Sequence, residues 1–145
     1  MKKNQIELQI KVPNQTRYLS LIGRISEELA AQLQNYTGDR NALANHINVV
    51  LTEALVNAIH HANADNPDEV VEIKISITDD ELLLKVFDHG RGFDLNSVTH
   101  NVVPEALDEL EDHGRGLFII RSLMDSVDYY QVKGGNVLEM HKRFR

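Results

Sequence analysis

The chain has 145 residues, of which 42% are hydrophobic and 26% are charged, values typical of one globular domain that buries its own core. It contains no cysteine, which excludes a disulfide framework and a thiolate metal site and fits a reducing compartment. The formal net charge of −7 argues against binding to the phosphates of nucleic acid, which requires clustered basic residues.

The N-terminal segment lacks the continuous apolar stretch of a signal peptide, and no apolar run approaches the length of a membrane span. We therefore expect a cytoplasmic protein that binds neither nucleic acid directly nor a membrane. Residues 1–145 are expected to form a single domain.

The first half of the chain shows clear periodicity. Residues 6–12 alternate between apolar and polar and end at Pro13, which predicts a half-buried strand. Apolar positions at helical spacing predict one helix over 18–33 and another over about 41–62. After the turn NADNPDE, the runs VVEIKISI and ELLLKVFD predict two antiparallel strands joined around Asp79 and Asp80.

After Asp88 the periodic pattern stops until residue 113, and a loop of that length in a small domain is usually functional or mobile. The run GRGLFIIRSLMDSV then has a helical pattern, and VDYYQV and NVLEMHKRF predict two strands around the turn KGG. This order predicts an α/β (α+β) two-layer sandwich, in which about three helices cover one face of a mainly antiparallel mixed sheet.

The segment LTEALVNAIHHA, residues 51–62, has an acid and an amide one turn apart in an apolar helix. On a helical wheel, Glu53, Asn57 and His60 lie along one polar line. A carboxylate, an amide oxygen and an imidazole in this arrangement can hold a hydrated cation beside a proton acceptor. Taken alone, the segment is better explained as the solvent edge of an amphipathic helix.

Two glycine-containing motifs follow. In FDHGRGFD, Asp88 ends a predicted strand and can accept a hydrogen bond from an exocyclic amine, while Gly90 and Gly92 permit close approach to a ligand. In HGRGLFII, Gly114 and Gly116 open a helix whose free N–H groups favour an anion. The alternatives are an ordinary glycine turn and a helix start weakened by glycine.

Together, ExxxN on a helix, DxGxG after a strand and GxG at a later helix resemble the Bergerat ATP-binding fold of the GHKL superfamily. The wording of the motifs is most similar to that of the anti-sigma factor serine kinases of the RsbW and SpoIIAB kind. The resemblance spans nearly the whole chain, and it implies an ATP lid around residues 93–113.

The resemblance implies a role for each polar residue of the first motif. Glu53 would be the general base for the attacking hydroxyl, and Asn57 would supply an oxygen ligand to Mg²⁺. Members of the family often have a histidine four residues after this asparagine, which points to His61, whereas the helical wheel favours His60. The choice between the two histidines stays open.

The other two motifs would bind the nucleotide. By resemblance, Asp88 would bind the adenine amino group, and Gly90 and Gly92 would let the chain pass the base. Three consecutive residues would wrap the phosphates: Gly114, Arg115 and Gly116.

Two features depart from the family pattern. Gly135 is followed by Asn136, where the family often has Gly-Thr; asparagine can still donate and accept near a phosphate or the lid. The lid is acidic, which leaves Arg115, His113 and Arg91 to meet charge that develops on a transferred phosphoryl group. Slow turnover or a lid that faces a basic partner would follow.

The resemblance implies an ATP-binding serine/threonine-protein kinase of a partner-switching module, which uses ATP/ADP and Mg²⁺. It would phosphorylate a STAS-domain anti-sigma factor antagonist, act as an anti-sigma factor by holding a sigma factor, and form a homodimer.

Three other functions are alternatives to this one. An ATP-dependent partner-binding switch without kinase activity would capture its partner unchanged after Glu53→Ala. A detached histidine-kinase-like ATPase domain would need a phosphoacceptor hairpin, for which no room is expected upstream of Ile6. A gyrase-like or Hsp90-like ATPase would need a transducer domain in addition.

Overall fold

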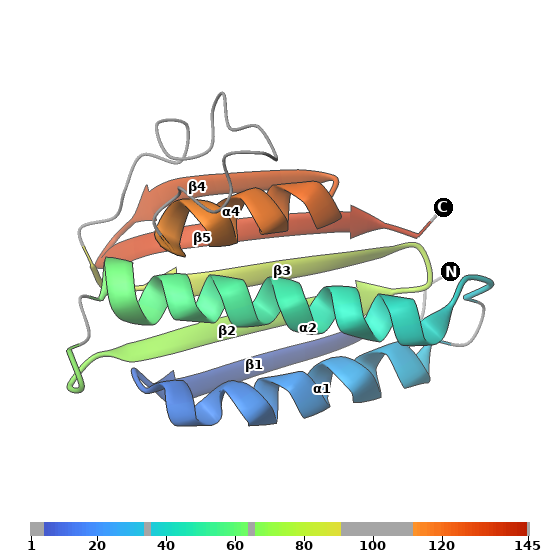
Figure 1. The fold of residues 1–145 in the computed structure, drawn as a ribbon, viewed down its shortest axis with the longest axis horizontal. Coiled ribbons are helices and arrows are strands. Elements are labelled where there is room, and N and C mark those ends of the chain that lie inside the picture. The colour runs from blue at the N-terminus through green and yellow to red at the C-terminus, as the bar shows by residue number, and fades with distance from the viewer. Residues whose placement is uncertain (1–4, 34–35, 64–65, 91–111, 145) are drawn as a thin grey trace.

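The computed structural model describes residues 5–33, 36–63, 66–90 and 112–144, and it places a five-stranded sheet on one side and the helices on the other (Figure 1). The side chains of residues 61, 62 and 112–114 are also outside the description. The elements in chain order are β1 Gln5–Pro13, the 3₁₀ turn η1 Thr16–Tyr18, α1 Leu19–Gln32, α2 Arg40–Asn57, the π-helical turn η2 Ala58–Ala62, β2 Val70–Thr78, β3 Glu81–Asp88, α4 Asp112–Leu123, β4 Ser126–Val132 and β5 Gly135–Arg143. The predicted order of elements is confirmed.

The strands are arranged in the order β1-β2-β3-β5-β4, and every neighbouring pair is antiparallel. The predicted pairing of β2 with β3 is confirmed, whereas the described strands include no parallel pair of the kind that a mixed sheet requires. Because β5 lies between β3 and β4, the start of β5 is next to the end of β3, with Asn136 opposite Asp88. This arrangement brings the last hairpin to the second motif.

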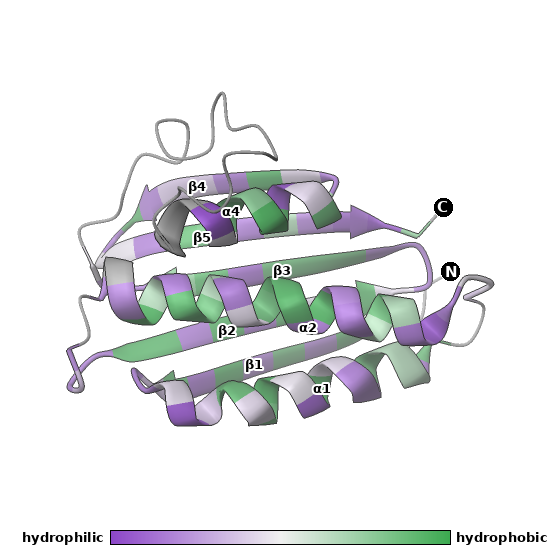
Figure 2. Cartoon of the chain, in the orientation of Figure 1, coloured by the Kyte–Doolittle hydropathy of each residue, from purple (hydrophilic) through white to green (hydrophobic). Residues whose placement is uncertain are grey.

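Apolar and polar residues alternate along the strands, visible as bands of opposite hydropathy in Figure 2, and the apolar residues pack the sheet against the helices. On β2, Ile73, Ile75 and Ile77 face the helices and are at most 2% exposed, while polar residues between them face outward. Figure 1 shows α2 between α1 and α4 in the helical layer. Because α2 lies beside α4, Glu53 on α2 lies close to the third motif on α4.

Helix α2 is the central core helix. Asp39 caps its N-terminus, and the Asp39 carboxylate accepts hydrogen bonds from the backbone of Asn41 and Ala42 at 2.9 and 3.2 Å. Contrary to the sequence expectation, residues Arg40–His60 are long and apolar enough to cross a membrane by length and composition. In this fold 56% of that window is buried, so its apolar residues are accounted for by core packing.

Helix α4 begins earlier than predicted. It starts at Asp112, so the last two residues of the predicted lid already belong to the helix and Gly114 is its third residue. Residues 93–111 of that lid lie outside the described part of the chain.

Candidate functional site

The first and third motifs meet where α2 packs against α4. Glu53 is half-buried on α2, and Gly116 is buried on α4. A Cβ atom on Gly116 would lie 2.6 Å from Oε2 of Glu53, which is much closer than an ordinary contact. Glycine at this position therefore gives the carboxylate room to lie against α4, which accounts for a residue that weakens a helix by about 1 kcal/mol relative to alanine.

Asn57, one turn after Glu53, has the chemistry of a cation ligand. The residue is 5% exposed, and its Oδ1 atom has no hydrogen-bond partner among the described residues. A buried polar atom left without a partner costs about 1–3 kcal/mol, so such atoms are rare unless a ligand uses them. An amide oxygen is a hard ligand that suits Mg²⁺, so the residue fits the metal that the family resemblance implies for it.

Asp88, the last residue of β3, is held in one orientation. Its Oδ1 atom accepts hydrogen bonds from the Gly90 backbone and from Asn136 Nδ2, both at 2.9 Å, and its Oδ2 atom accepts from the Tyr129 hydroxyl at 3.2 Å. A carboxylate offers about four acceptor sites, and these bonds occupy three of them. Although Asp88 is 4% exposed, the bonds from the described residues leave one acceptor site on Oδ2 for a donor such as an exocyclic amine.

The start of β5 supports the turn that follows Asp88. Asn136 donates from Nδ2 to the Gly90 carbonyl at 2.9 Å as well as to Asp88. A Cβ atom on Gly135 would lie 1.8 Å from the carbonyl oxygen of Asp88, so only glycine fits there. The sequence analysis noted that an asparagine here can still donate and accept near a phosphate or the lid. Among the described residues, Asn136 donates to Asp88 and Gly90, and most of the lid lies outside them.

Tyr129 was not identified from the sequence. Burial, together with the charge of Asp88 and the hydrogen bond to it, raises the pKa of Tyr129 well above its ordinary value. The phenol therefore stays protonated and remains a hydrogen-bond donor to Asp88. The run VDYYQV contains no signal for this role beyond strand alternation, because the contact depends on how β4 packs beside β5.

The histidine question is changed by the π-helical turn. After Asn57 the helix widens, and the backbone N–H of Asn63 donates to the carbonyl of Ala58 at 2.8 Å. A wheel drawn at 100° per residue does not apply beyond Asn57, so it gives no support for His60. His60 is exposed, and the side chain of His61 lies outside the described residues.

The remaining predicted site residues are placed only in part. Gly90 contributes its backbone to the Asp88 turn, and Gly92 lies outside the described residues. Gly114 is in the first turn of α4, and Arg115 is half-buried on the same helix.

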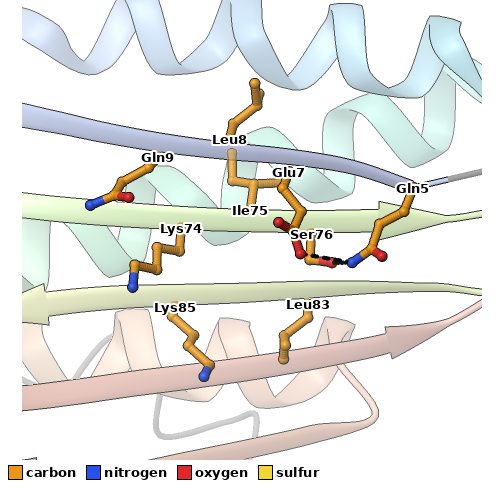
Figure 3. A pocket seen from close by; sticks show the side chains of 9 residues that line it. All are labelled: Gln5, Glu7, Leu8, Gln9, Lys74, Ile75, Ser76, Leu83 and Lys85. Carbon is orange, nitrogen blue, oxygen red and sulfur yellow. Dashed lines mark hydrogen bonds between the residues drawn. The ribbon is translucent and has the colours of Figure 1, made fainter.

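A separate concavity of about 570 Å³ is formed by β1, β2 and β3 and is lined by both polar and apolar side chains (Figure 3). Lys74 and Lys85 contribute ammonium groups to it, and Gln5 donates to Glu7 and Ser76. None of the three motifs contributes to its lining.

Comparison with known proteins gives consistent findings. A family model described as the histidine kinase-like ATPase domain matches residues 12–142. The chain is 30% identical over 131 residues to the serine-protein kinase RsbW of Bacillus subtilis, a match that covers 88% of this chain and 79% of that protein. It is 29% identical over 140 residues to RsbW of Staphylococcus aureus, covering 92% and 85%.

Solved structures share the fold at lower identity. The SiaB–SiaC complex from Pseudomonas aeruginosa matches with a TM-score of 0.59 and 17% identity, over 94% of this chain and 89% of that chain. A histidine kinase domain from the blue-light activated histidine kinase of Erythrobacter litoralis matches with a TM-score of 0.53 and 19% identity. This chain is covered to 92% in that match but spans only 62% of the kinase domain chain.

Proposed function

The chain belongs to the histidine kinase-like ATPase family, among the serine-protein kinases of the RsbW kind, and on that premise we propose its substrate and mechanism. It transfers the terminal phosphoryl group of ATP to a serine or threonine of a STAS-domain anti-sigma factor antagonist. The observation that supports this most directly is the close approach of Glu53 to Gly116. It lies one helical turn from the Asn57 oxygen, which has no hydrogen-bond partner in the part of the chain that the structure describes. An acid, and an amide oxygen that would ligate the cation, thereby lie one helical turn apart beside the motif that would bind the phosphates.

Mg·ATP supplies the phosphoryl group and the positive charge that stabilises the transferred oxygens, and the chain positions both reactants. The Glu53 carboxylate accepts the proton of the substrate hydroxyl while that oxygen forms its bond to phosphorus and the bond to ADP breaks. Asn57 Oδ1 would ligate the cation, and the free acceptor site of Asp88 would bind the adenine amine. Gly90, Gly92 and the backbone around Gly114–Gly116 would line the nucleotide, with Arg115 beside its phosphates.

Phosphorylation of the antagonist decides which partner the protein holds. When the antagonist carries a phosphate, the protein is released to bind a sigma factor and acts as an anti-sigma factor. The serine-protein kinase relatives support this assignment, and the acidic, cysteine-free composition supports a cytoplasmic location.

Labelled ATP, Mg²⁺ and a purified STAS-domain antagonist test the proposal. The wild-type protein is expected to label the antagonist, and Glu53→Gln is expected to label it at least about 100-fold more slowly while binding ADP as before. Glu27→Gln, a change at an exposed acid on α1, serves as the control and keeps the wild-type rate.

Absence of label with the wild-type protein would remove the kinase assignment. If the Glu53 variant captured its partner in an ATP-dependent manner while the wild type transferred no phosphate, the non-catalytic switch would be the correct alternative.

A homodimer is proposed through β1 and α1. Strand β1 is at the edge of the sheet, and beside it Ile6, Leu8, Ile25 and Leu29 line an apolar groove of about 340 Å³. An edge strand beside an apolar groove, on which Leu8 is 36% exposed, is a site that a second copy can cover. Sedimentation is expected to show a dimer that Leu8→Lys dissociates, whereas Val132→Lys on the opposite edge strand leaves it intact; a monomeric wild type would contradict this.

A further inference from the structure

Two buried asparagines outside the three motifs connect the end of β1 with the residue that follows Asp88. Asn14 comes directly after β1, Asn63 comes directly after η2, and each is 4% exposed. Asn63 Nδ2 donates to Asn14 Oδ1 at 3.1 Å, and Asn63 Oδ1 accepts from the His89 backbone N–H at 2.9 Å. Two side chains and one backbone N–H, from three distant segments, thus form one continuous chain of hydrogen bonds.

Asn14 is itself fixed by the surrounding backbone. Its Nδ2 atom donates to the carbonyls of Asn66 at 2.9 Å and Ile59 at 3.4 Å, and its backbone N–H donates to the Glu69 carbonyl at 3.1 Å. The amide nitrogen of Asn14 therefore points away from Asn63, and the amide oxygen of Asn14 faces Asn63. Buried amides with all their partners satisfied have one defined orientation.

Asn63 can consequently be oriented in only one way. If its amide were reversed, NH₂ would face the His89 N–H and Oδ1 would face Oδ1 of Asn14, so that like groups would oppose each other at both ends. The oxygen is thereby directed at the first backbone N–H after β3, where the strand ladder has ended at Asp88.

This contact sets the course of the chain at the base-binding turn. His89 lies between Asp88 and Gly90, whose backbone N–H donates to the Asp88 carboxylate. The other side of the turn is held by the hairpin between β4 and β5, where His89 Nδ1 donates to the Gly134 carbonyl at 3.2 Å. Asn63 contacts this turn from the helical layer, because it directly follows η2, which continues α2.

We propose that Asn63, oriented by Asn14, is a positioning residue that aims the Asp88 carboxylate at the nucleotide base. The inference rests on the proposed nucleotide-binding function and assigns a role to two residues that no motif contains. Asn63 touches the turn rather than the nucleotide, so its loss affects the base-binding end and leaves the phosphate-binding end unchanged.

The test is calorimetric titration of Mg·ADP and of Mg-tripolyphosphate, which has no base, into wild type and variants below their melting temperatures. Asn63→Leu keeps the approximate size of the side chain and removes both hydrogen bonds. We expect about tenfold weaker ADP binding, the effect of one lost buried hydrogen bond, and unchanged tripolyphosphate binding. Asn63→Asp retains an acceptor for the His89 N–H and is expected to recover part of the ADP affinity.

Asn48→Leu is the matched control, because Asn48 is a half-buried amide on α2 that accepts from Thr52 and does not contact the turn. It is expected to leave ADP affinity within about twofold of wild type, a difference smaller than one lost hydrogen bond. If Asn63→Leu does not fold, Asn14→Ala carries the same test, since Asn14 contacts Asn63 and not the turn.

Unchanged ADP affinity in Asn63→Leu, or in Asn14→Ala where that variant carries the test, overturns the inference. An equal loss of ADP and tripolyphosphate affinity also overturns it, because that pattern indicates general damage to the fold. A wild-type protein that binds no ADP removes the proposed function itself, and this outcome is distinct from a wild type that binds while the variant binds equally well.

Discussion

Replacement of Gly116 by alanine separates the stability of the protein from the position of its general base. The new Cβ atom would lie 2.6 Å from Oε2 of Glu53, whereas ordinary contact begins at 3.4 Å. The carboxylate oxygen therefore has to withdraw by about 0.8 Å, the difference between these two distances. The next nearest atoms to the added carbon are Cδ and Cβ of Glu53 at 3.6 and 3.7 Å, so the backbone of α2 does not have to move.

The free energy of unfolding is expected to stay the same or to rise. The end of a glutamate side chain moves at little cost, and alanine in a helix is up to about 1 kcal/mol more favourable than glycine. Catalysis is expected to suffer, because a misplacement of roughly 1 Å can cost about 100-fold in rate. We therefore predict phosphoryl transfer slowed about 10- to 100-fold in a protein that is at least as stable as wild type.

The assay is the rate of antagonist labelling at saturating Mg·ATP, combined with urea unfolding and ADP titration. Gly23→Ala on α1 is the matched control, since its Cβ would lie 3.2 Å from the Asn48 side chain and the residue is not part of the three motifs. Transfer at the wild-type rate in Gly116→Ala would refute the role of Glu53, and a large loss of stability would refute the steric reasoning.

Three further predictions follow from the site. Gly135→Ala would place a carbon 1.8 Å from the Asp88 carbonyl oxygen, a backbone atom that cannot withdraw as a side chain can. Circular dichroism should therefore show a melting temperature at least several degrees lower, and an unchanged value would contradict the close approach. Asn57→Leu removes a buried oxygen that has no partner among the described residues, so the protein without nucleotide should be as stable as wild type or more stable. The thermal shift caused by Mg·ADP should disappear, and a retained shift would exclude Asn57 as a ligand. Because the pKa of Tyr129 is raised, the folded protein keeps the phenol proton at a pH above 10.0, the ordinary pKa, where the unfolded protein releases it. The contribution of this proton to the free energy of unfolding is therefore complete below pH 10 and is lost as the pH rises further. The free energy of unfolding falls from this cause by at most about 1.4 kcal/mol per pH unit, and by less because solvent reaches this half-buried residue. Tyr129→Phe should show a shallower fall of stability at alkaline pH than wild type, and an equal fall would mean that another group is responsible.

Much of the fold follows from local patterns. Alternation predicted β2 and β3 with nearly correct ends, and helical spacing predicted α1 and the central helix α2. These patterns succeed because each element exposes one face to the core and the other to solvent. The π-helical turn after Asn57 was missed, since a change from helical to π-helical hydrogen bonding leaves the spacing of apolar residues almost the same.

The sequence draws attention to candidate site residues only where they lie close to one another or to the end of an element. Glu53 and Asn57 lie one turn apart on one helix, and Asp88 directly ends a strand, so local spacing drew attention to all three. Their roles came from the family resemblance and stay predictions. Tyr129 meets Asp88 across 41 positions, and Asn63 meets Asn14 across 49. Such contacts depend on strand order and on the packing of η2 against the sheet, neither of which the spacing of residue types records.

The central claim is that α2, the Asp88 turn and α4 form one site for a magnesium-bound adenine nucleotide. Calorimetric titration of ADP into the wild-type protein, with and without Mg²⁺, tests it most directly. The expected result is saturable 1:1 uptake that is weakened when Mg²⁺ is chelated and is nearly lost in a variant that combines Asp88→Asn with Asn57→Leu. No heat of uptake in the wild type, or equal uptake by the double variant, would contradict the account.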